Sequence, residues 1–162
     1  MLSLALMEIN ILIDKKFKKY IKSSWLKNIV LQMLNAENVG AKSEIGLVIA
    51  DNKKIQELNL KYLEEDRPTD VLSFPMNEQL SNSPDFVNVP DGKLHLGEVI
   101  ISYPQAVRQA AEHNHSTEKE IAILVIHGIL HLLGYDHDIP EREQAMRQRE
   151  LAILTEIEEQ VT

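Results

Sequence analysis

The stretch TEKEIAILVIHGILHLLGYDH, residues 117–137, predicts a buried central helix that ends in a turn. Thr117 and Glu120 are spaced as a capping box, so we expect this helix over residues 118–133. Residues 121–126 (IAILVI) are apolar on every side of such a helix, which places it in the interior. Gly134 suits the left-handed backbone conformation that ends a helix and reverses the chain.

Three histidines of this stretch are spaced to meet at one point. His127 and His131 are four residues apart, so on a helix their rings lie one turn apart on the same face. The turn at Gly134 then returns His137 to the same place. Three imidazoles leave one position of a tetrahedral ion open to water or substrate, which is the pattern of a catalytic zinc site. Burial favours the neutral ring, the form that binds a metal.

The alternative for these histidines is that they are unrelated polar residues. A helical pair followed by a glycine turn and a returning third histidine makes the metal site the stronger interpretation. The remaining histidines have no such spacing, and we expect surface roles for His95, His113 and His115.

The spacing H-x-x-x-H-x-x-G-x-x-H also occurs in the metzincin metalloproteases. In those enzymes a glutamate, the general base, follows the first histidine, whereas this chain has Gly128 there. Glycine cannot take a proton from water or return it to an amine leaving group. This departure disfavours peptide hydrolysis and leaves phosphodiester cleavage open, because a metal alone can lower the pKa of its bound water to about 7.

Composition indicates one domain, residues 1–162, with 44% hydrophobic and 26% charged residues. Cysteine is absent, so a metal must be held by nitrogen and oxygen, which fits a reducing cytoplasm. The N-terminal residues 1–9 lack the basic leader of a signal peptide, and no apolar run is long enough to cross a membrane. We therefore expect a cytoplasmic protein with no membrane partner.

The formal net charge of −8 argues against a general affinity for nucleic acid, but the charges are unevenly distributed. Acidic residues gather near the C-terminus, and lysines gather near the N-terminus together with Phe17, Tyr20 and Trp25. One end could therefore face phosphates, although a solvated helix face explains the same pattern. The lysines in question are Lys15, Lys16, Lys18, Lys19, Lys22 and Lys27.

Four strands and five helices are expected along the chain. Branched and alternating apolar runs predict strands at residues 7–13, 44–50, 71–74 and 96–102. Besides the central helix, we expect helices from a cap at Ser23 or Ser24 to about Asn35, from a cap at Asp51 to residue 63, and over residues 104–113 and 141–159. Residues 75–95 are polar and rich in turn-forming types, so they form the longest loop.

Three motifs, in this order, resemble the YbeY endoribonucleases, metal-dependent bacterial ribosomal RNA maturation factors. They are residues 66–75 (DRPTDVLSFP), 96–102 (LGEVIIS) and 127–137 (HGILHLLGYDH), and the resemblance covers about residues 44–138. It implies an α+β fold in which a small mixed four-stranded sheet lies beside a zincin-like metal helix. It also implies single-strand RNA cleavage in small-subunit (16S) ribosomal RNA maturation and ribosome quality control. One zinc ion per chain is implied, bound by His127, His131 and His137.

The chain departs from the family at one position. Many members carry an arginine, tied to activity, where this chain has Leu63. Arg67, four residues later, is a candidate catalytic replacement, and Lys61 is a candidate phosphate contact, but both also fit ordinary surface charges. Either an arginine at this position is dispensable in this subgroup of the family, or catalysis by this subgroup is weaker than catalysis by the arginine-bearing members.

In the hypothesised mechanism a metal-bound water is the nucleophile. Four further residues have hypothetical roles in this mechanism or in the structure beside it. Asp136 either orients a ligand imidazole or caps the turn after Gly134. Asp70 and Ser73 are expected to fix the turn and strand beside the cleft rather than to react. Glu98 is a weak candidate for the general base.

The leading hypothesis is a zinc-dependent endoribonuclease with ribosomal RNA as its substrate and ribosomal proteins as candidate partners. A metalloprotease-like hydrolase and a non-catalytic ribosome-assembly factor with a structural metal are the alternatives. The sequence leaves the oligomeric state and the metal open, since imidazole also suits nickel, copper and iron.

Overall fold

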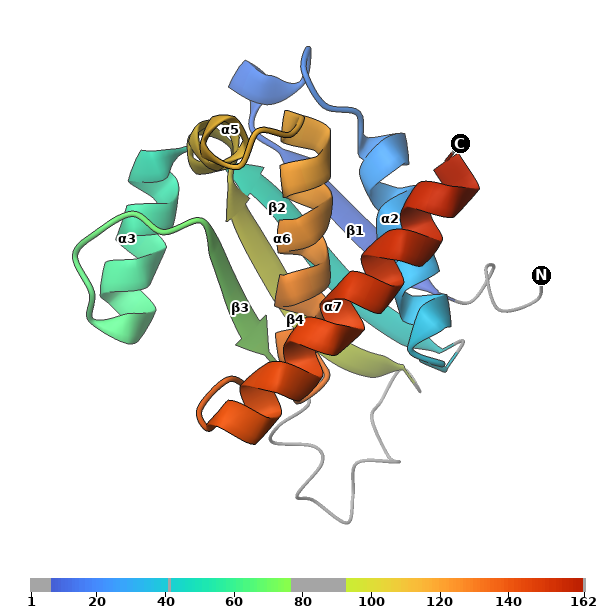
Figure 1. The fold of residues 1–162 in the computed structure, drawn as a ribbon. Helices are drawn as coiled ribbons and strands as arrows, with labels where there is room; N and C mark the ends of the chain where they lie inside the picture. Colours follow the sequence, from blue (N-terminus) through green and yellow to red (C-terminus); the bar gives the residue numbers. More distant parts are fainter. Residues whose placement is uncertain (1–6, 41, 77–92, 162) are drawn as a thin grey trace.

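The computed structural model describes residues 7–40, 42–76 and 93–161, which form a four-stranded sheet and five α-helices (Figure 1). The expected α+β class, with four strands and five longer helices, is confirmed. The strands are β1 (Glu8–Ile13), β2 (Ser43–Ala50), β3 (Val71–Pro75) and β4 (Leu94–Ser102). The helices are α2 (Ser23–Ala36), α3 (Asn52–Leu63), α5 (Tyr103–Glu112), α6 (Thr117–Leu132) and α7 (Pro140–Val161), with a short 3-10 helix, η1 (Lys15–Phe17).

The sheet is mixed, as the family resemblance implied. Its strand order is β1-β2-β4-β3. The neighbours β1 and β2 are parallel, as are β2 and β4, and β3 pairs antiparallel with β4. In that antiparallel pair Ser73 is opposite Val99, which places the first and second family motifs side by side under the helix that carries the third.

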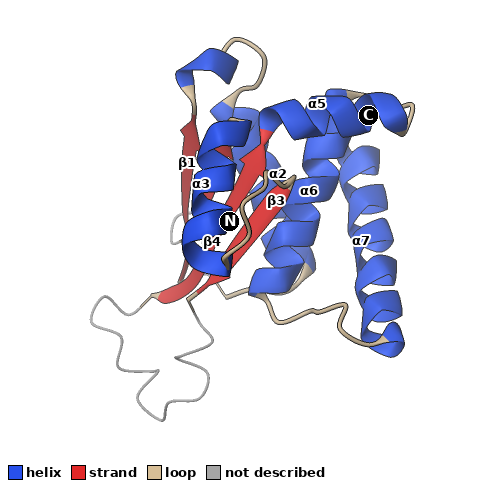
Figure 2. Cartoon of the chain, turned by 90° about the vertical axis from the view of Figure 1, so that its left-hand side faces the viewer, coloured by secondary structure: helices blue, strands red, loops and turns tan. Residues whose placement is uncertain are grey.

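Helix α6 is central because the sheet covers one of its faces and other helices cover the opposite face. It packs on β3 and β4, and α2 and α7 lie against it (Figure 1). Figure 2 shows α6 between the sheet and α7. Residues such as Ile121, Val125 and Ile126 are 1% exposed or less, which confirms the expectation from the all-apolar run. The opposite face of the sheet forms a smaller core in which Ile55 of α3 packs with Leu72 and Ile100.

The helix ends agree with the sequence in part. Asp51 caps α3 as expected, since its carboxylate accepts a hydrogen bond from the Lys54 N–H at 2.8 Å. The expected serine cap of α2 is wrong: the N-cap is Lys22, with no side-chain cap, and the helix already includes both serines. The rest of the expected long loop, residues 77–92, lies outside the described residues, and β4 begins at Leu94.

The expected capping box of α6 is also wrong by one residue. The N-cap is Ser116, whose hydroxyl accepts from the Lys119 N–H at 3.1 Å. The Glu120 carboxylate does not turn back to the helix end but contacts His113 and His115 instead. None of the helices among residues 7–161 that the structure describes is both long and apolar enough to span a bilayer.

Candidate metal centre

The fold brings the three histidines of the central motif together. Helix α6 carries His127 and His131, whose Nε2 atoms lie 3.2 Å apart. After α6 the chain reverses at Gly134, which has a φ of +101° as expected. This turn returns His137, whose ring centroid lies 5.1 Å from that of His131 and 6.2 Å from that of His127. We call these three residues the histidine trio.

Two sets of donor atoms in and beside the histidine trio have spacings that suit a divalent transition-metal ion: His127 with His131, and His131 with His137 and Asp136. Two nitrogens bound to one tetrahedral zinc ion are about 3.4 Å apart, close to the distance between the two Nε2 atoms of His127 and His131. Donor atoms of His131, His137 and Asp136 also lie within 4.8 Å of one another. Neutral imidazole suits zinc, copper, iron and nickel, so the donor set defines the class of ion rather than its identity.

The electrostatics at His131 favour metal binding. Burial is the main cause that lowers the pKa of His131, and its neighbours His127 and His137 lower it further. Asp136 and a hydrogen bond with the Tyr135 backbone act in the opposite direction but are weaker. Burial therefore favours the neutral form of the ring, whose nitrogen lone pair is available to a cation.

Glu150 of α7 orients His127. Its carboxylate Oε1 hydrogen-bonds to His127 Nδ1, which leaves Nε2 of the same ring directed at His131. Such a carboxylate–histidine pair fixes the tautomer of a metal ligand and raises its basicity. The sequence analysis missed Glu150, because it lies 23 residues from His127 among many other acids and no local spacing connects them.

The histidine trio opens into a cavity of about 510 Å³. Asp70 and Ser73 form part of its wall and act as supports, in agreement with the sequence. Asp70 accepts hydrogen bonds from the Val71 N–H at 2.8 Å and from the Gln109 side chain at 3.3 Å, while Ser73 Oγ donates to the Gly128 carbonyl at 3.0 Å. The cavity leaves room for a substrate next to the three rings.

Asp136 makes the turn contact proposed for it and also lies near the rings. Its Oδ1 accepts a hydrogen bond from the His137 N–H at 2.7 Å and lies 3.8 Å from His137 Nδ1. The side chain is about half exposed. Its position is therefore compatible with both roles considered from the sequence.

Three other candidates are not brought to the histidine trio. The guanidinium of Arg67 is 73% exposed and pairs with Glu65 at 3.0 Å, and Arg67 does not line the cavity. Lys61 lies over the Tyr62 ring, with its Nζ 5.2 Å from the ring centroid. Glu98 lies on the opposite face of the sheet from α6, since the next residue, Val99, is the one that faces α6.

Gly128, which stands where a metzincin has its general base, is a packing residue. An ideal Cβ at this position would lie 2.6 Å from Val99 Cγ1 and 3.3 Å from Ser73 Oγ. The position faces the sheet and is buried. No glutamate fits there, so the structure supplies a physical reason for the departure from the metalloprotease motif.

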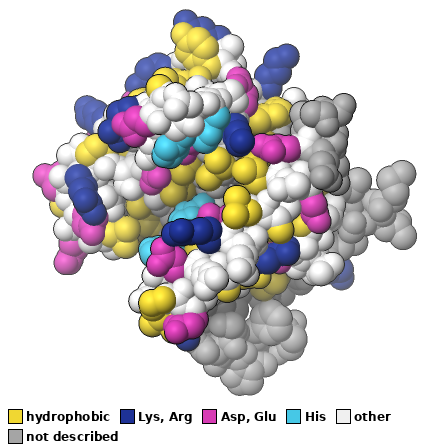
Figure 3. All heavy atoms as spheres, viewed as in Figure 1, with side chains coloured by type: hydrophobic (Ala, Val, Ile, Leu, Met, Phe, Trp, Pro, Cys, Tyr) yellow, Lys and Arg dark blue, Asp and Glu magenta, His cyan; other side chains and the backbone are white. Residues whose placement is uncertain are grey.

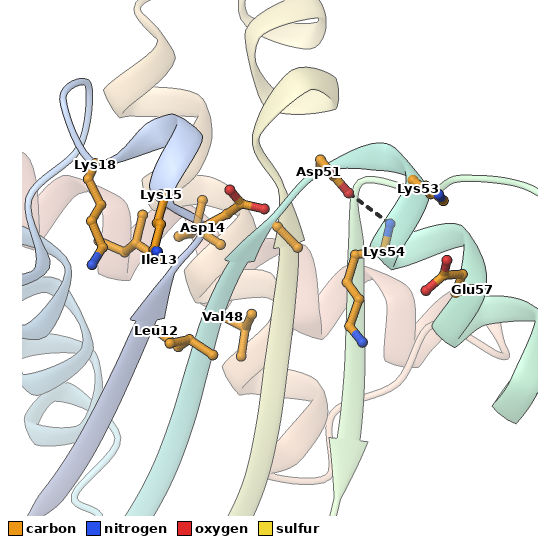
Figure 4. Close-up of a pocket in the computed structure, with 12 residues that line it drawn as sticks. Leu12, Ile13, Asp14, Lys15, Lys18, Val48, Asp51, Lys53, Lys54 and Glu57 are labelled. Carbon is orange, nitrogen blue, oxygen red and sulfur yellow. Dashed lines mark hydrogen bonds between the residues drawn. The ribbon is translucent and has the colours of Figure 1, made fainter.

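A larger cavity, of about 590 Å³, lies away from the histidines, near the carboxyl ends of β1 and β2 (Figure 4). Lys15, Lys18, Lys53 and Lys54 are among its lining residues, and no histidine is. Each of the N-terminal lysines noted in the sequence is exposed. Their neighbours Phe17 and Tyr20 stack on Tyr103, with ring centroids 4.7 and 5.9 Å apart respectively.

Fold and site together are those of a small α+β protein with a candidate metal centre. The solution structure of TM1509 from Thermotoga maritima is similar, with a TM-score of 0.58 and 28% sequence identity, covering 94% of this chain and 93% of that one. A family model described as endoribonuclease YbeY matches residues 9–158. The chain belongs to this family.

Curated relatives agree with that assignment. An endoribonuclease YbeY from Dehalococcoides mccartyi is 46% identical over 157 residues, which cover 94% of this chain and 91% of the relative. Another, from a Roseiflexus species, is 42% identical over 147 residues and covers 90% of both chains. The family is metal-dependent, and the histidines described above offer donors for such a metal.

Proposed function

We propose that this chain is a zinc-dependent endoribonuclease that cleaves single-stranded regions of small-subunit ribosomal RNA during its maturation. The observation that carries the proposal is the convergence of His127, His131 and His137 beside an open cavity, in a chain of the endoribonuclease YbeY family. The proposed ligands are these three histidines, with one ion per chain.

The residues around the ion have distinct tasks. A divalent cation bound there supplies Lewis acidity toward a phosphoryl group and lowers the pKa of a water molecule. Glu150 holds the His127 ring in the tautomer that presents Nε2 to the site. Asp136 positions His137 through the backbone of the turn, and Ser73 anchors β3 to α6 so that the cavity keeps its shape.

The general base is a carboxylate of the site rather than a residue of the metzincin motif. Asp136 is the candidate, because it is half exposed and has a donor atom within 4.8 Å of donor atoms of both His131 and His137. A carboxylate at this distance from the rings can accept a proton from an attacking water. We keep Arg67 as a candidate phosphate contact only for RNA that extends beyond the cavity, since its guanidinium pairs with Glu65.

The substrate and partners follow from the same proposal. RNA brings phosphates, and the exposed lysines near the N-terminus offer a surface of matching charge, although the chain as a whole carries −8. Ribosomal RNA in the cytoplasm is the proposed target, with ribosomal proteins as candidate partners in its delivery.

The two alternatives are less well supported. Proteolysis would need a general base next to the first histidine, and the packing of Gly128 on Val99 leaves no space for one. A purely structural metal is disfavoured because the histidine trio lines a cavity instead of being enclosed.

The test is cleavage of a fluorescent single-stranded fragment of 16S ribosomal RNA, with casein as a parallel substrate, each with and without a chelator. We expect RNA cleavage that the chelator abolishes and re-added zinc restores, and no casein cleavage. The variants are His131→Ala and His137→Ala, and the matched control is His95→Ala, whose ring contacts Glu44 away from the trio. Elemental analysis of protein purified without chelator or nickel resin identifies the metal.

Each outcome bears on the proposal. Loss of cleavage in both trio variants, with retained activity in the control, supports it. Full RNA cleavage by His131→Ala and His137→Ala would contradict the metal mechanism. Absence of both activities, together with unfolding on chelation, would favour the assembly-factor alternative. Circular dichroism of each variant separates loss of the site from loss of the fold.

A further inference from the structure

A second group of metal-binding side chains lies at the junction between α5 and α6. His113 follows the last residue of α5, and His115 lies in the short turn before α6. Glu120 extends from the first turn of α6. Its Oε1 lies 3.0 Å from His113 Nδ1 and 2.6 Å from His115 Nε2, so both rings converge on one carboxylate oxygen. We call these three residues the junction cluster.

The burial of Glu120 demands a compensating positive charge. Its side chain is only 4% exposed, and an ionised carboxylate so far from water is costly unless it is paired. Among the described residues, its ion-pair contacts within 4.0 Å are with His113 and His115, and no lysine or arginine contributes. A divalent cation at the point where the two rings and the carboxylate converge would balance the buried charge.

The geometry of the junction cluster suits a small divalent ion. One donor atom from each of its three residues lies within 4.8 Å of the other two. Ligands of a tetrahedral zinc ion are about 3.4 Å apart, so the two nitrogen–oxygen distances would widen by less than about 1 Å. The His113 side chain can make that movement because it is 56% exposed. Imidazole and carboxylate donors select a first-row transition metal over calcium or magnesium, which prefer oxygen alone.

We propose that His113, His115 and Glu120 form a second binding site for a divalent transition-metal ion such as Zn²⁺. The site ties the end of α5 to the first turn of α6, the helix that carries His127 and His131. Asn114, between the two histidines, has a φ of +59°, so the backbone of the turn already holds both rings on the same side as Glu120. The fourth position of the ion is left to water.

Solvent and metal can reach this site. A cavity of about 320 Å³ is lined by His113 and Glu120 at one end and by His127 at the other, with Ile123 and Leu124 between them. Figure 3 shows histidine side chains at two separate places on this face, with hydrophobic side chains between them. Glu120 and His127 are seven residues apart on α6, about 10 Å along its axis, so the two sites are too distant to share one ion.

The test counts bound metal. Protein stripped with a chelator is equilibrated with micromolar Zn²⁺ alone, passed through a desalting column and analysed for zinc per chain. We expect two equivalents for the wild type, one for His131→Ala, one for His115→Ala and none for the double variant. His95→Ala is the matched control, since it removes a histidine that contacts Glu44 and belongs to neither cluster, and it keeps two equivalents.

A second variant and a second readout distinguish loss of the metal site from misfolding of the variant. His113→Ala removes a half-exposed ligand and leaves the buried Glu120–His115 contact in place, so it keeps the fold while it loses the second equivalent. In the His131→Ala background, added Zn²⁺ should raise the melting temperature, and this rise should vanish with His113→Ala. Co²⁺ in place of zinc should give a visible absorption in His131→Ala that the double variant lacks.

The proposal is overturned if His131→Ala binds no zinc, or if His113→Ala and His115→Ala both retain two equivalents. Either result would mean that the junction cluster is held by hydrogen bonds alone. The zinc count is independent of RNA cleavage, so failure of the proposed nuclease activity would leave this test unaffected.

Discussion

Gly128 of α6 lies so close to Val99 of β4 that a Cβ on the glycine would come within 2.6 Å of a valine methyl group. Ser73 of the neighbouring strand reinforces the contact, since its Oγ donates to the Gly128 carbonyl at 3.0 Å. Two of the family motifs therefore meet the third at this point. The close approach of α6 to the sheet positions the helix turn that carries His127 and His131.

Replacement of Gly128 by alanine should destabilise the protein by about 1–2 kcal/mol. The added methyl group overpacks the contact with Val99, at a cost of about 1–3 kcal/mol, and the better helix propensity of alanine offsets up to about 1 kcal/mol. The measurement is urea-induced unfolding of metal-free protein. Gly40→Ala is the matched control, because no atom lies within 4 Å of its added Cβ, and it should change stability by less than about 0.5 kcal/mol. Equal stability of the two variants would contradict the packing argument.

Replacement of Glu150 by glutamine should weaken zinc binding at the histidine trio by about 10–100-fold. The amide keeps the shape of the side chain but loses the charge that orients His127 and raises its basicity. A competition titration against a chromophoric chelator measures the effect. Glu156→Gln, an exposed position on the same helix, should leave the affinity unchanged. An unaltered zinc affinity in Glu150→Gln would mean that the contact of Glu150 with His127 does not influence metal binding.

The central helix and its histidines were predictable because their signals are local. His127 and His131 are one helical turn apart on α6. Gly134 has the positive φ that was expected for a glycine just after the end of this helix. The mixed order of the sheet was expected only through the family resemblance, since strand pairing joins residues far apart in the chain, such as Ser73 and Val99.

Contacts between distant segments were not predictable in the same way. Glu150 reaches His127 only because α7 folds back along α6. Arg67 was expected near the site from its position in the chain, but its guanidinium lies beside Glu65, two residues away. Glu120 was assigned to a helix cap, and its burial between two histidines appears only when α5 and α6 pack together.

The stability of the metal-free protein should fall as the pH drops below about 6.5, in part through His131. The folded state lowers the pKa of His131, chiefly by burial, from an ordinary value of 6.5. Between those two values the unfolded chain binds more protons than the folded one, so the free energy of unfolding rises with pH. Above 6.5 both states are neutral and the residue makes no contribution. His131→Asn should flatten this slope in urea unfolding between pH 5 and 8, and an unchanged slope would contradict the assignment.

Replacement of Leu63 by arginine should raise RNA cleavage. Leu63 ends α3, lines the cavity of the histidine trio and is 53% exposed, and it occupies the position where many members of the family carry an arginine. A guanidinium there would meet a phosphate of the bound RNA in a bidentate contact. A gain of about 1.4 kcal/mol in transition-state stabilisation corresponds to about a tenfold increase in kcat/KM.

The matched control for this substitution is Leu60→Arg. Leu60 lies on the same helix and is 49% exposed, but it does not line the cavity. Both variants add one positive charge, so a general attraction for RNA would raise kcat/KM equally in both and would fade equally with salt. An increase confined to Leu63→Arg shows that the charge acts at the cavity. An equal change in kcat/KM in the two variants would mean that leucine at position 63 does not lower the rate of catalysis.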